Sequence, residues 1–262
     1  MSIVLSIDMT DPTGGTGVNA AVKTVHSLGG YACTAITAVS VQTPDEMISI
    51  SAIDPKTVKD QIDAIRKTWD IQAVLVGMLP NKKIIDVVSD YLDECHDENL
   101  FVVIDPVVSN RQGYKFLLKK DIHAMKQRLL MHADVVTPNK YEAEQLTGLK
   151  ISDRESAEHA AEMLMTLGCH SVLIKEQNVK DDVIFDLFLD DENFYTVESP
   201  YLDTKSIHGA GTTLAAAIAT SVAMGMPVAN AVSGARGYLA QAIQNAPQMV
   251  DADHYGPVEH FV

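Results

Sequence analysis

Short apolar segments alternate with longer amphipathic segments along nearly the whole chain. Five of the apolar segments are rich in valine and isoleucine and almost free of polar residues, which is typical of strands buried on both faces of a parallel sheet. They are residues 2–7, 73–78, 100–105, 133–138 and 171–175. Between them, apolar positions recur at the spacing of amphipathic helices. The predicted helices are residues 17–30, 55–70, 82–99, 120–132 and 153–168.

The pattern changes in the last third of the chain. Residues 182–190 and 193–200 predict the two strands of a hairpin around the polar turn DDEN. Two long helices are expected over residues 211–225 and 227–246. Because no repeat, low-complexity tract or linker interrupts the chain, we predict one domain over residues 1–262. Its expected architecture is a three-layer α/β/α fold with a mostly parallel, doubly wound sheet and helices on both faces, which binds ligands at the carboxyl ends of its strands.

The composition limits the classes of partner and compartment. The chain has 262 residues, of which 47% are apolar, so it can bury a sizeable core. A net charge of −15 argues against nucleic acid and anionic membranes as partners. No apolar run is long enough to predict a membrane span, and the first residues do not read as a signal peptide. Three cysteines without metal spacing indicate a reduced, cytoplasmic protein.

The first glycine-rich segment, TDPTGGTGVNAAV, follows the first predicted strand and precedes a helix. Its residues 15–20 match a relaxed dinucleotide-binding pattern, G-x-G-x-x-A. That pattern requires glycines directly after the strand and an acid at the end of the next strand. Here DMTDPT intervenes, and the next strand offers Ser40 and Gln42. A plain strand-to-helix turn is an alternative, but a loop whose backbone closes over a small ligand fits the spacing better.

The second glycine-rich segment, HGAGTT, precedes a helix of small residues. Gly209 and Gly211 allow a tight turn, so that consecutive backbone N–H groups point into one pocket beside the positive end of the helix dipole. An acidic molecule has to bind phosphate with such local devices, with lysines or with a metal ion. The segment therefore predicts an anion site, the alternative being a flexible hinge or a close-packing helix.

Polar side chains follow several of the predicted strands. Asn139 and Glu142 lie one helical turn apart and suit a hydrated Mg²⁺, although they equally fit an N-cap and a capping box. Asp105 ends a buried strand, where an acid is unexpected unless it bonds, caps or ligates. Lys175 ends another strand and could reach a phosphate or form a salt bridge. His208 could contact a ligand, with local packing as the more ordinary role; the other histidines lack ligand spacing, so no zinc site is expected.

Taken together, these segments resemble the ribokinase superfamily, and within it the kinases of hydroxymethylpyrimidine and its phosphate in thiamine biosynthesis. The resemblance covers nearly the whole chain and rests on TDPTGGTGVNAAVKT, GGYACTAITAVSVQ, VGML, VVIDPVV, VVTPNKYEAEQLTG, LIK, TKSIHGAGTTLAAAIA and YGPVEHF. It implies a ribokinase-like fold, a homodimer, and transfer of the γ-phosphoryl group of Mg·ATP to the pyrimidine's hydroxymethyl group and then to the resulting monophosphate. Pyridoxal kinases share this scaffold and are the nearest rival.

The resemblance also implies the roles of individual residues. The transferring phosphoryl group would lie against Gly209, Ala210, Gly211 and Thr212. The pyrimidine would contact Gln42 and Met78, with Met9, Thr16 and Val107 nearby. ATP would be bound by Lys175, Asn139 and Thr213, and Mg²⁺ would be organised by Glu142, Asn139 and Asp105.

Three departures from the family's usual residues bear on activity. Asp8 and Met9 replace an alanine–glycine pair, and Met9 is expected to reshape the pyrimidine pocket. Glu176 and Gln177 replace two glycines, and Thr212 replaces a cysteine or, in sugar kinases, an aspartate. Threonine cannot act as a base at neutral pH, so we expect phosphorylation of the monoester to be spared more than that of the alcohol. The alternatives are a kinase of a B6 vitamer and a diverged paralogue that binds a pyrimidine or nucleotide without turnover.

Overall fold

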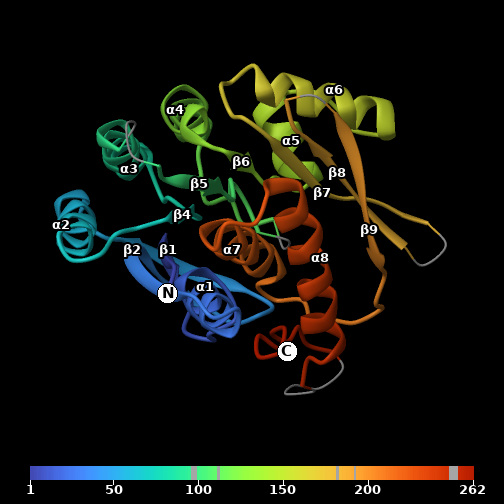
Figure 1. The fold of residues 1–262 in the computed structure, drawn as a ribbon, viewed down its shortest axis with the longest axis horizontal. Helices are drawn as coiled ribbons and strands as arrows, with labels where there is room; N and C mark the ends of the chain where they lie inside the picture. Colours follow the sequence, from blue (N-terminus) through green and yellow to red (C-terminus); the bar gives the residue numbers. More distant parts are fainter. Residues whose placement is uncertain (96–98, 111–112, 181–182, 192, 248–252) are drawn as a thin grey trace.

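The computed structural model of the protein describes most of the chain. It covers residues 1–95, 99–110, 113–180, 183–191, 193–247 and 253–262, with only the backbone described in residues 176–180. In this part of the chain, nine strands form one sheet in the order β3-β2-β1-β4-β5-β6-β7-β8-β9 (Figure 1). The strands are β1 (Ile3–Thr10), β2 (Tyr31–Gln42), β3 (Met47–Ala52), β4 (Ala73–Val76), β5 (Phe101–Ile104), β6 (Val135–Val136), β7 (Val172–Lys180), β8 (Val183–Leu189) and β9 (Phe194–Pro200).

The central strands are parallel and the outer ones are antiparallel. β1 pairs in parallel with both β2 and β4, and parallel pairing continues through β5 and β6 to β7. β3 pairs antiparallel with β2, and β8 and β9 extend the other edge as an antiparallel hairpin. The chain leaves β1 toward β3 and later returns to place β4 on the other side of β1. The carboxyl ends of β1 and β4 therefore flank a switch point, where doubly wound folds bind ligands.

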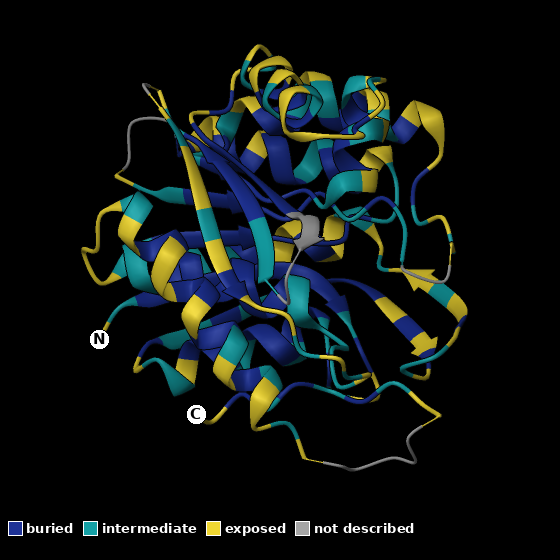
Figure 2. Ribbon diagram, turned by 90° about the vertical axis from the view of Figure 1, so that its right-hand side faces the viewer, coloured by how far each residue is buried: buried dark blue, intermediate teal, exposed yellow. Residues whose placement is uncertain are grey.

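Helices cover both faces of the sheet, which lies buried between them (Figure 2). α1, α7 and α8 lie along one face, and α2 to α6 lie along the other (Figure 1). The helices are α1 (Gly17–Ser27), α2 (Pro55–Arg66), α3 (Lys82–Glu94), α4 (Lys119–Ala124), α5 (Lys140–Thr147), α6 (Arg154–Met165), α7 (Ala210–Ala223) and α8 (Val228–Gln244).

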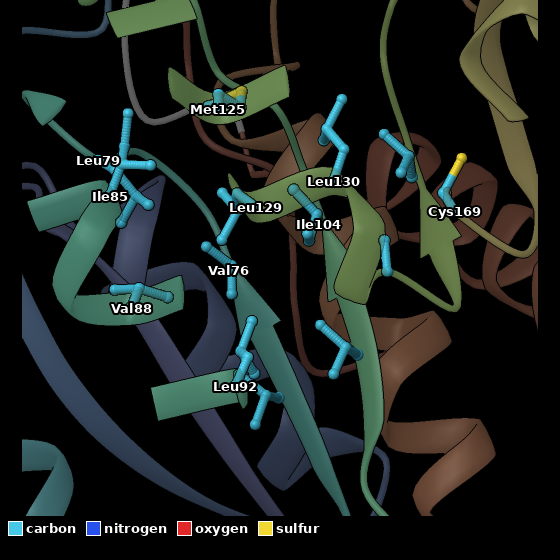
Figure 3. Packing of buried hydrophobic residues seen from close by; sticks show 14 of the residues in the cluster. Val76, Leu79, Ile85, Val88, Leu92, Ile104, Met125, Leu129, Leu130 and Cys169 are labelled. Atoms are coloured by element: carbon cyan, nitrogen blue, oxygen red, sulfur yellow. The ribbon is translucent and has the colours of Figure 1, made fainter. Parts of the chain in front are cut away.

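Two apolar clusters fill the spaces between the sheet and the helices. Successive strand residues point to opposite faces, so Leu5 of β1 belongs to one cluster and Val4 to the other. In the larger cluster, Val76 and Ile104 of the central strands pack with side chains of α3 and of the segment after α4 (Figure 3). In the other cluster, residues 215–219 of α7 are all fully buried and mostly alanine. These small side chains let α7 lie close to the sheet, which brings its N-terminus to the carboxyl ends of the strands.

The predicted buried strands, the hairpin and the doubly wound architecture are confirmed. The sequence pattern did not reveal β3, whose segment MISISA lies at the sheet edge and pairs antiparallel with β2. β7 continues beyond the predicted end at Lys175, to Lys180. Residues 96–98, within a predicted helix, and residues 182 and 192, within the predicted hairpin, lie outside the described residues.

The helix predicted over residues 120–132 is wrong in its regularity. α4 ends at Ala124, a π-helical turn follows over Met125–Leu129, and a 3₁₀ turn over Leu130–His132 completes the segment. The changes in pitch turn Met125, Leu129 and Leu130 toward the core, and all three are fully buried. An unbroken α-helix would separate the neighbours Leu129 and Leu130 by about 100° around its axis.

The cysteines and the helix lengths add two facts about the chain's chemistry and surroundings. Cys33, Cys95 and Cys169 are free and buried. Burial raises the pKa of the Cys33 thiol, and raises that of Cys169 to about 12, so neither is a ready nucleophile. Within the described ranges, no helix combines the length and apolar character that crossing a membrane requires.

Candidate active site

A cavity of about 220 Å³ lies at the carboxyl edge of the parallel strands. Met9 and Gln42 reach it from the ends of β1 and β2, and Asp105 and Asn139 from the segments after β5 and β6. The cavity, hereafter the active-site cavity, brings together most of the residues singled out in the sequence. These are Met9, Thr16, Gln42, Asp105, Val107, Asn139, Glu142, Lys175, Gly209, Ala210, Gly211 and Thr212.

Asp11 holds the first glycine loop, residues 11–17, in shape. Its carboxylate accepts hydrogen bonds from the backbone N–H groups of Thr13, Gly15 and Thr16 at 2.9–3.0 Å. It also accepts one from the Thr13 hydroxyl, and His208 Nε2 lies 2.9 Å from Asp11 Oδ2. Burial opposes the ionisation of Asp11, but the bonds from His208 and Thr13 outweigh it and hold its pKa well below the usual range. The loop is therefore organised around a permanent carboxylate.

The second glycine loop, residues 208–213, packs directly on the first. Gly209 has a φ of 85°, and a Cβ there would lie 1.7 Å from the carbonyl oxygen of Gly15. A Cβ on Gly15 would in turn lie 2.2 Å from Cδ2 of the His208 ring. Only glycine fits at these two positions, because any side chain would push the loops apart. The Asp11–His208 pair joins the same two loops by charge and hydrogen bonding.

The N-terminus of α7 lies on the cavity wall, at the predicted anion site. Gly209 is the N-cap residue and offers no side chain, while Ala210 N–H and Thr213 N–H donate to backbone carbonyls. The N–H groups of Gly211 and Thr212 have no acceptor among the described residues. Unfilled N–H groups at the positive end of a helix dipole bind anions. The α7 N-terminus thus offers two N–H donors that have no acceptor among the described residues, and the anion site stays a prediction.

Lys175 brings a cation beside that site. Its ammonium donates to Asp105 Oδ1 at 2.7 Å, and a Cβ on Gly211 would lie 3.4 Å from Lys175 Nζ. The Thr137 hydroxyl donates to the same Asp105 oxygen at 3.1 Å. Both members of the Lys175–Asp105 pair are less than 10% exposed. The sequence left open whether Lys175 forms a salt bridge or reaches a phosphate. Lys175 forms the salt bridge with Asp105, and its ammonium also lies beside Gly211 at the predicted anion site.

Asn139 and Glu142 form a capping box at the start of α5. Glu142 N–H donates to Asn139 Oδ1 and Asn139 N–H donates to Glu142 Oε2, both at 2.9 Å. Burial raises the pKa of Glu142 above its usual range, Lys175 opposes the rise and Asp105 adds to it. A cation beside Glu142 would restore its ionised form.

The donors around Glu142 fit Mg²⁺ in its usual protein setting. Mg²⁺ is commonly held by one or two carboxylates plus waters and phosphate oxygens. Asp105, Glu142 and Asn139 line the same cavity and supply two carboxylates and an amide. No cluster of three or more His, Cys, Asp or Glu side chains suited to a metal occurs in the described part of the chain. The site therefore fits a hydrated ion shared with phosphate better than one enclosed by protein ligands.

The opposite end of the cavity is apolar with one amide. Met9, Met47, Val107 and Phe116 line it, and Met9 and Met47 are less than 10% exposed. Gln42 lines the same end, and its buried Nε2 has no hydrogen-bond partner among the described residues. A buried amide donor without a partner in a binding cavity is suited to an acceptor atom on a ligand.

A turn at the rim joins the cavity to the end of the chain. Thr43, Pro44 and Glu46, between β2 and β3, line the cavity. Asp45 Oδ1 accepts a hydrogen bond from Tyr255 N–H at 2.9 Å, and its Oδ2 lies 2.9 Å from His254 Nδ1. Tyr255 also lines the cavity. The β2–β3 turn is therefore held over the cavity by the C-terminal segment.

Two of the predicted site residues do not line the cavity. Met78 is 1% exposed and packs in the apolar cluster beneath Met9. Thr213 is fully buried, and its hydroxyl lies 3.2 Å from His260 Nε2 in the core. Their predicted contacts with pyrimidine and ATP stay predictions that this geometry does not support. The side chains of Glu176 and Gln177 lie outside the described residues.

Two residues of the site stand out only in the structure. In the sequence Asp11 is one residue of a glycine-rich motif, but in the structure its carboxylate bonds to residues of both loops. Arg236 lines the cavity, is 4% exposed, and donates from Nε to Ser199 Oγ at 2.9 Å beside Asp186. The available signal was an arginine among the small and apolar residues of SGARGYLA.

Comparison with known proteins identifies this arrangement. A family model described as phosphomethylpyrimidine kinase matches residues 11–259. The chain is 35% identical over 261 residues to the hydroxymethylpyrimidine/phosphomethylpyrimidine kinase of Rhizobium meliloti (strain 1021), covering 99% of this chain and 97% of that protein.

Solved structures resemble the fold over nearly its full length. The pyridoxal kinase from Staphylococcus aureus, in complex with AMP-PCP and pyridoxal, superimposes with a TM-score of 0.89 at 30% identity and covers 100% of this chain and 94% of its own. The phosphomethylpyrimidine kinase from Clostridium difficile 630 gives a TM-score of 0.80 at 28% identity and covers 93% and 100%. The chain therefore belongs to the phosphomethylpyrimidine kinase family and has the ribokinase-like fold.

Proposed function

We propose that this protein transfers the γ-phosphoryl group of ATP to 4-amino-5-hydroxymethyl-2-methylpyrimidine, and transfers a second one to the resulting monophosphate, in thiamine biosynthesis. Its membership of the phosphomethylpyrimidine kinase family shows that the protein is a phosphotransferase. The observation that carries the proposal is that one cavity joins an apolar, amide-bearing end to an anion site with two free N–H donors. Such a cavity holds a planar heterocycle and places its substituent where a phosphoryl group binds.

Each end of the cavity has a distinct task in the transfer. The apolar wall of Met9, Met47 and Val107 would hold the ring, and the Gln42 amide would orient it through a ring nitrogen. Mg²⁺, held by Glu142, Asn139 and Asp105, would neutralise phosphate charge. Lys175 and the free N–H groups of α7 would stabilise the equatorial oxygens of the transferring group. Phosphoryl transfer depends mainly on such positioning and charge stabilisation.

Thr212 bears on which of the two transfers is faster. It lies at the anion site, where its hydroxyl can donate to an anion but cannot take a proton at neutral pH. The alcohol acceptor has a poorly acidic proton to lose, whereas a phosphate monoester, with a second pKa of about 6, is already largely ionised. We therefore propose that the monophosphate is the better acceptor in this protein.

Substitution of Thr212 by cysteine tests this preference. General-base assistance contributes about 10²–10⁴-fold where it operates fully, so even a weakly basic cysteine is expected to help the alcohol step by roughly 10-fold relative to the monoester step. The monoester step has no proton to lose and gives up the Thr212 hydroxyl as a donor, so its rate is expected to fall. Initial rates with both acceptors report the ratio, and Thr220→Cys, in the same helix but away from the cavity, is the control. Equal acceleration of both steps would contradict the proposal.

The structural comparison favours a second candidate acceptor. The pyridoxal kinase from Staphylococcus aureus superimposes with a higher TM-score than the phosphomethylpyrimidine kinase from Clostridium difficile, 0.89 against 0.80. An ATP-turnover assay with hydroxymethylpyrimidine, its phosphate and pyridoxal separates the candidates. Turnover with pyridoxal alone would replace the proposed acceptor. Absence of turnover, with thermal stabilisation by the same ligands, would indicate the binding-only paralogue. A cytoplasmic homodimer is the state we expect, and sedimentation of the purified protein tests the dimer.

A further inference from the structure

Thr16 begins α1 but does not cap it. It is the N-cap residue, and its side chain makes no capping hydrogen bond. A threonine in that position normally accepts a hydrogen bond from an N–H group of the first turn, which stabilises the helix. The α1 N-terminus thus forgoes an ordinary local bond, and the hydroxyl has a different partner.

That partner is the hydroxyl of Thr212. The two Oγ1 atoms lie 3.1 Å apart, although the residues are separated by 196 positions in the sequence. Both residues line the active-site cavity, and Thr212 is 6% exposed. Threonine within a helix often bonds to a carbonyl of the preceding turn, as Thr220 does with Ala216 in the same helix. Thr212 instead points across to the first glycine loop.

The hydrogen bond between Thr16 and Thr212 uses only one of their two hydroxyl protons. Two hydroxyl groups carry two protons, and the bond between them uses one. Neither oxygen has another hydrogen-bond partner among the described residues. The second proton therefore has no acceptor among the described residues. If Thr16 is the donor, the free proton belongs to Thr212 and joins the N–H groups of Gly211 and Thr212 as a third donor of the predicted anion site.

We propose that Thr16 is a positioning residue, which donates to Thr212 Oγ1 and so directs the Thr212 O–H toward the transferring phosphoryl group. The inference rests on the proposed function. In the transfer, the bond between the γ-phosphorus and the bridging oxygen of ADP breaks and a bond to the acceptor oxygen forms. An alcohol acceptor releases its proton to water, an ionised monoester has none to release, and Thr212 keeps its own throughout.

Two physical effects favour this direction of the bond. A hydroxyl that accepts a hydrogen bond becomes a better donor, because successive hydrogen bonds polarise one another. Negative charge is spread over the equatorial oxygens of a transferring phosphoryl group, so a polarised O–H directed at them would meet a charged acceptor. The opposite direction would leave the free proton on Thr16, which belongs to the first glycine loop and not to the α7 N-terminus.

A double-mutant cycle on Thr16 and Thr212 tests the coupling. Valine replaces each threonine with a side chain of the same shape and no hydroxyl, and Thr16→Ser restores the hydroxyl. We expect Thr212→Val to lower kcat by about 10- to 100-fold and Thr16→Val by about 5-fold, with the KM for ATP and for the acceptor changed by less than about twofold. In the Thr212→Val background, Thr16→Val is expected to have no further effect, since its partner hydroxyl is gone.

Three further measurements separate positioning from a merely structural role. Thr16→Ser is expected to recover most of kcat. Calorimetry is expected to show that Thr16→Val weakens binding of ADP with aluminium fluoride, a planar phosphoryl mimic, but not of ADP alone. Thr220→Val, which removes a hydroxyl from α7 away from the cavity, is the matched control and is expected to keep kcat.

The outcomes distinguish this inference from the proposed function. A wild-type protein that turns over no acceptor would overturn the proposed function and the inference with it. An active wild type in which Thr16→Val leaves kcat unchanged, or multiplies the loss caused by Thr212→Val, would overturn the positioning role alone. A loss of stability in Thr16→Val that accounts for its lower kcat, measured by denaturation, would also overturn it.

Discussion

Asp8 shows how one residue can be placed by contacts that the local sequence does not reveal. It is 2% exposed, and its Oδ1 accepts hydrogen bonds from the N–H groups of Met9 and Met78 at 2.7 and 2.9 Å. A Cβ on Gly77 would lie 2.0 Å from Asp8 Oδ2, so Gly77 leaves the space that the carboxyl group occupies. Asp8 stands out in the sequence as a departure from the family, but Gly77 and Met78 directly follow β4, which only the folded sheet brings alongside β1.

Burial raises the pKa of Asp8 from 3.8 to about 7, against the opposing effect of the Met78 and Met9 N–H groups. The folded protein therefore binds this proton more tightly than the unfolded chain does. The stabilisation is present below pH 4 and is lost as pH rises through 7. With each pKa unit contributing about 1.36 kcal/mol, the loss is roughly 4 kcal/mol.

Asp8→Asn isolates that contribution. Asparagine keeps an oxygen acceptor for both N–H groups but carries no charge. The unfolding free energy of the variant should therefore lack the part of the pH dependence that Asp8 causes in the wild type. We expect wild type and variant to converge below about pH 4, and the variant to be more stable by a few kcal/mol at pH 8. Urea denaturation across this range measures the difference, with the exposed Asp63→Asn in α2 as control. Parallel pH profiles for wild type and Asp8→Asn would show that Asp8 is ionised in the folded state.

At the scale of elements, the contact between the two glycine loops decides where the α7 N-terminus lies. Gly209→Ala places a methyl group 1.7 Å from the Gly15 carbonyl oxygen at a φ of 85°. We expect the loops to separate, with a loss of kcat/KM of about 100-fold or more, because small displacements at a reacting centre are costly.

Gly225→Ala, at the other end of the same helix, provides the matched control. Its φ is 89°, so the backbone strain is the same, but its Cβ would meet nothing within 4 Å. We expect a stability loss of about 1 kcal/mol and nearly full activity. Kinetics with denaturation of both variants separate strain from loop displacement. Equal activity in the two alanine variants would show that the loop contact does not place the anion site.

The elements themselves could be predicted to the extent that their patterns are local. Buried parallel strands read as continuous apolar runs, and helix α5 begins at a capping box visible as N-K-Y-E. β3 could not be recognised, because MISISA is short, interrupted by two serines and defined by pairing with β2. The tight turn before α7 was predictable from Gly209 and Gly211, because the backbone freedom of glycine is local. The role of Asp11 was not, because it depends on His208, 197 positions away.

For the whole molecule, an anionic ligand has to bind a chain of net charge −15. In the proposed function, the groups that would meet this are local: the α7 N-terminus, the Lys175 ammonium and a Mg²⁺ ion beside Glu142. Exposed acidic side chains act through water and salt. At ordinary ionic strength, screening removes most of their effect at distances beyond about 10 Å. The composition thus predicted which partners to exclude but could not show where the compensating charge lies.

The C-terminal segment, residues 253–262, connects two loops that line the same cavity. The C-terminal segment reaches the second glycine loop, where His208 N–H donates to Gly256 O at 2.9 Å, and Lys205 Nζ donates to Asp253 O at 2.8 Å. It reaches the β2–β3 turn through Asp45, which accepts from Tyr255 N–H. The segment is thus a strap between the β2–β3 turn and the second glycine loop, which line the same cavity.

Removing the Asp45 carboxylate tests whether that strap sets acceptor affinity. In Asp45→Ala the β2–β3 turn keeps its strands but loses its bond to Tyr255, so we expect the KM for the acceptor to rise by about threefold to tenfold and kcat to change little. The Tyr255 N–H bond lowers the pKa of Asp45, so the carboxylate stays ionised throughout the assay range. Asp60→Ala, which removes an exposed ion pair in α2, is the control. A fall in kcat at constant KM would instead place the effect at the glycine loop, because the strap would then act on phosphoryl transfer and not on acceptor binding.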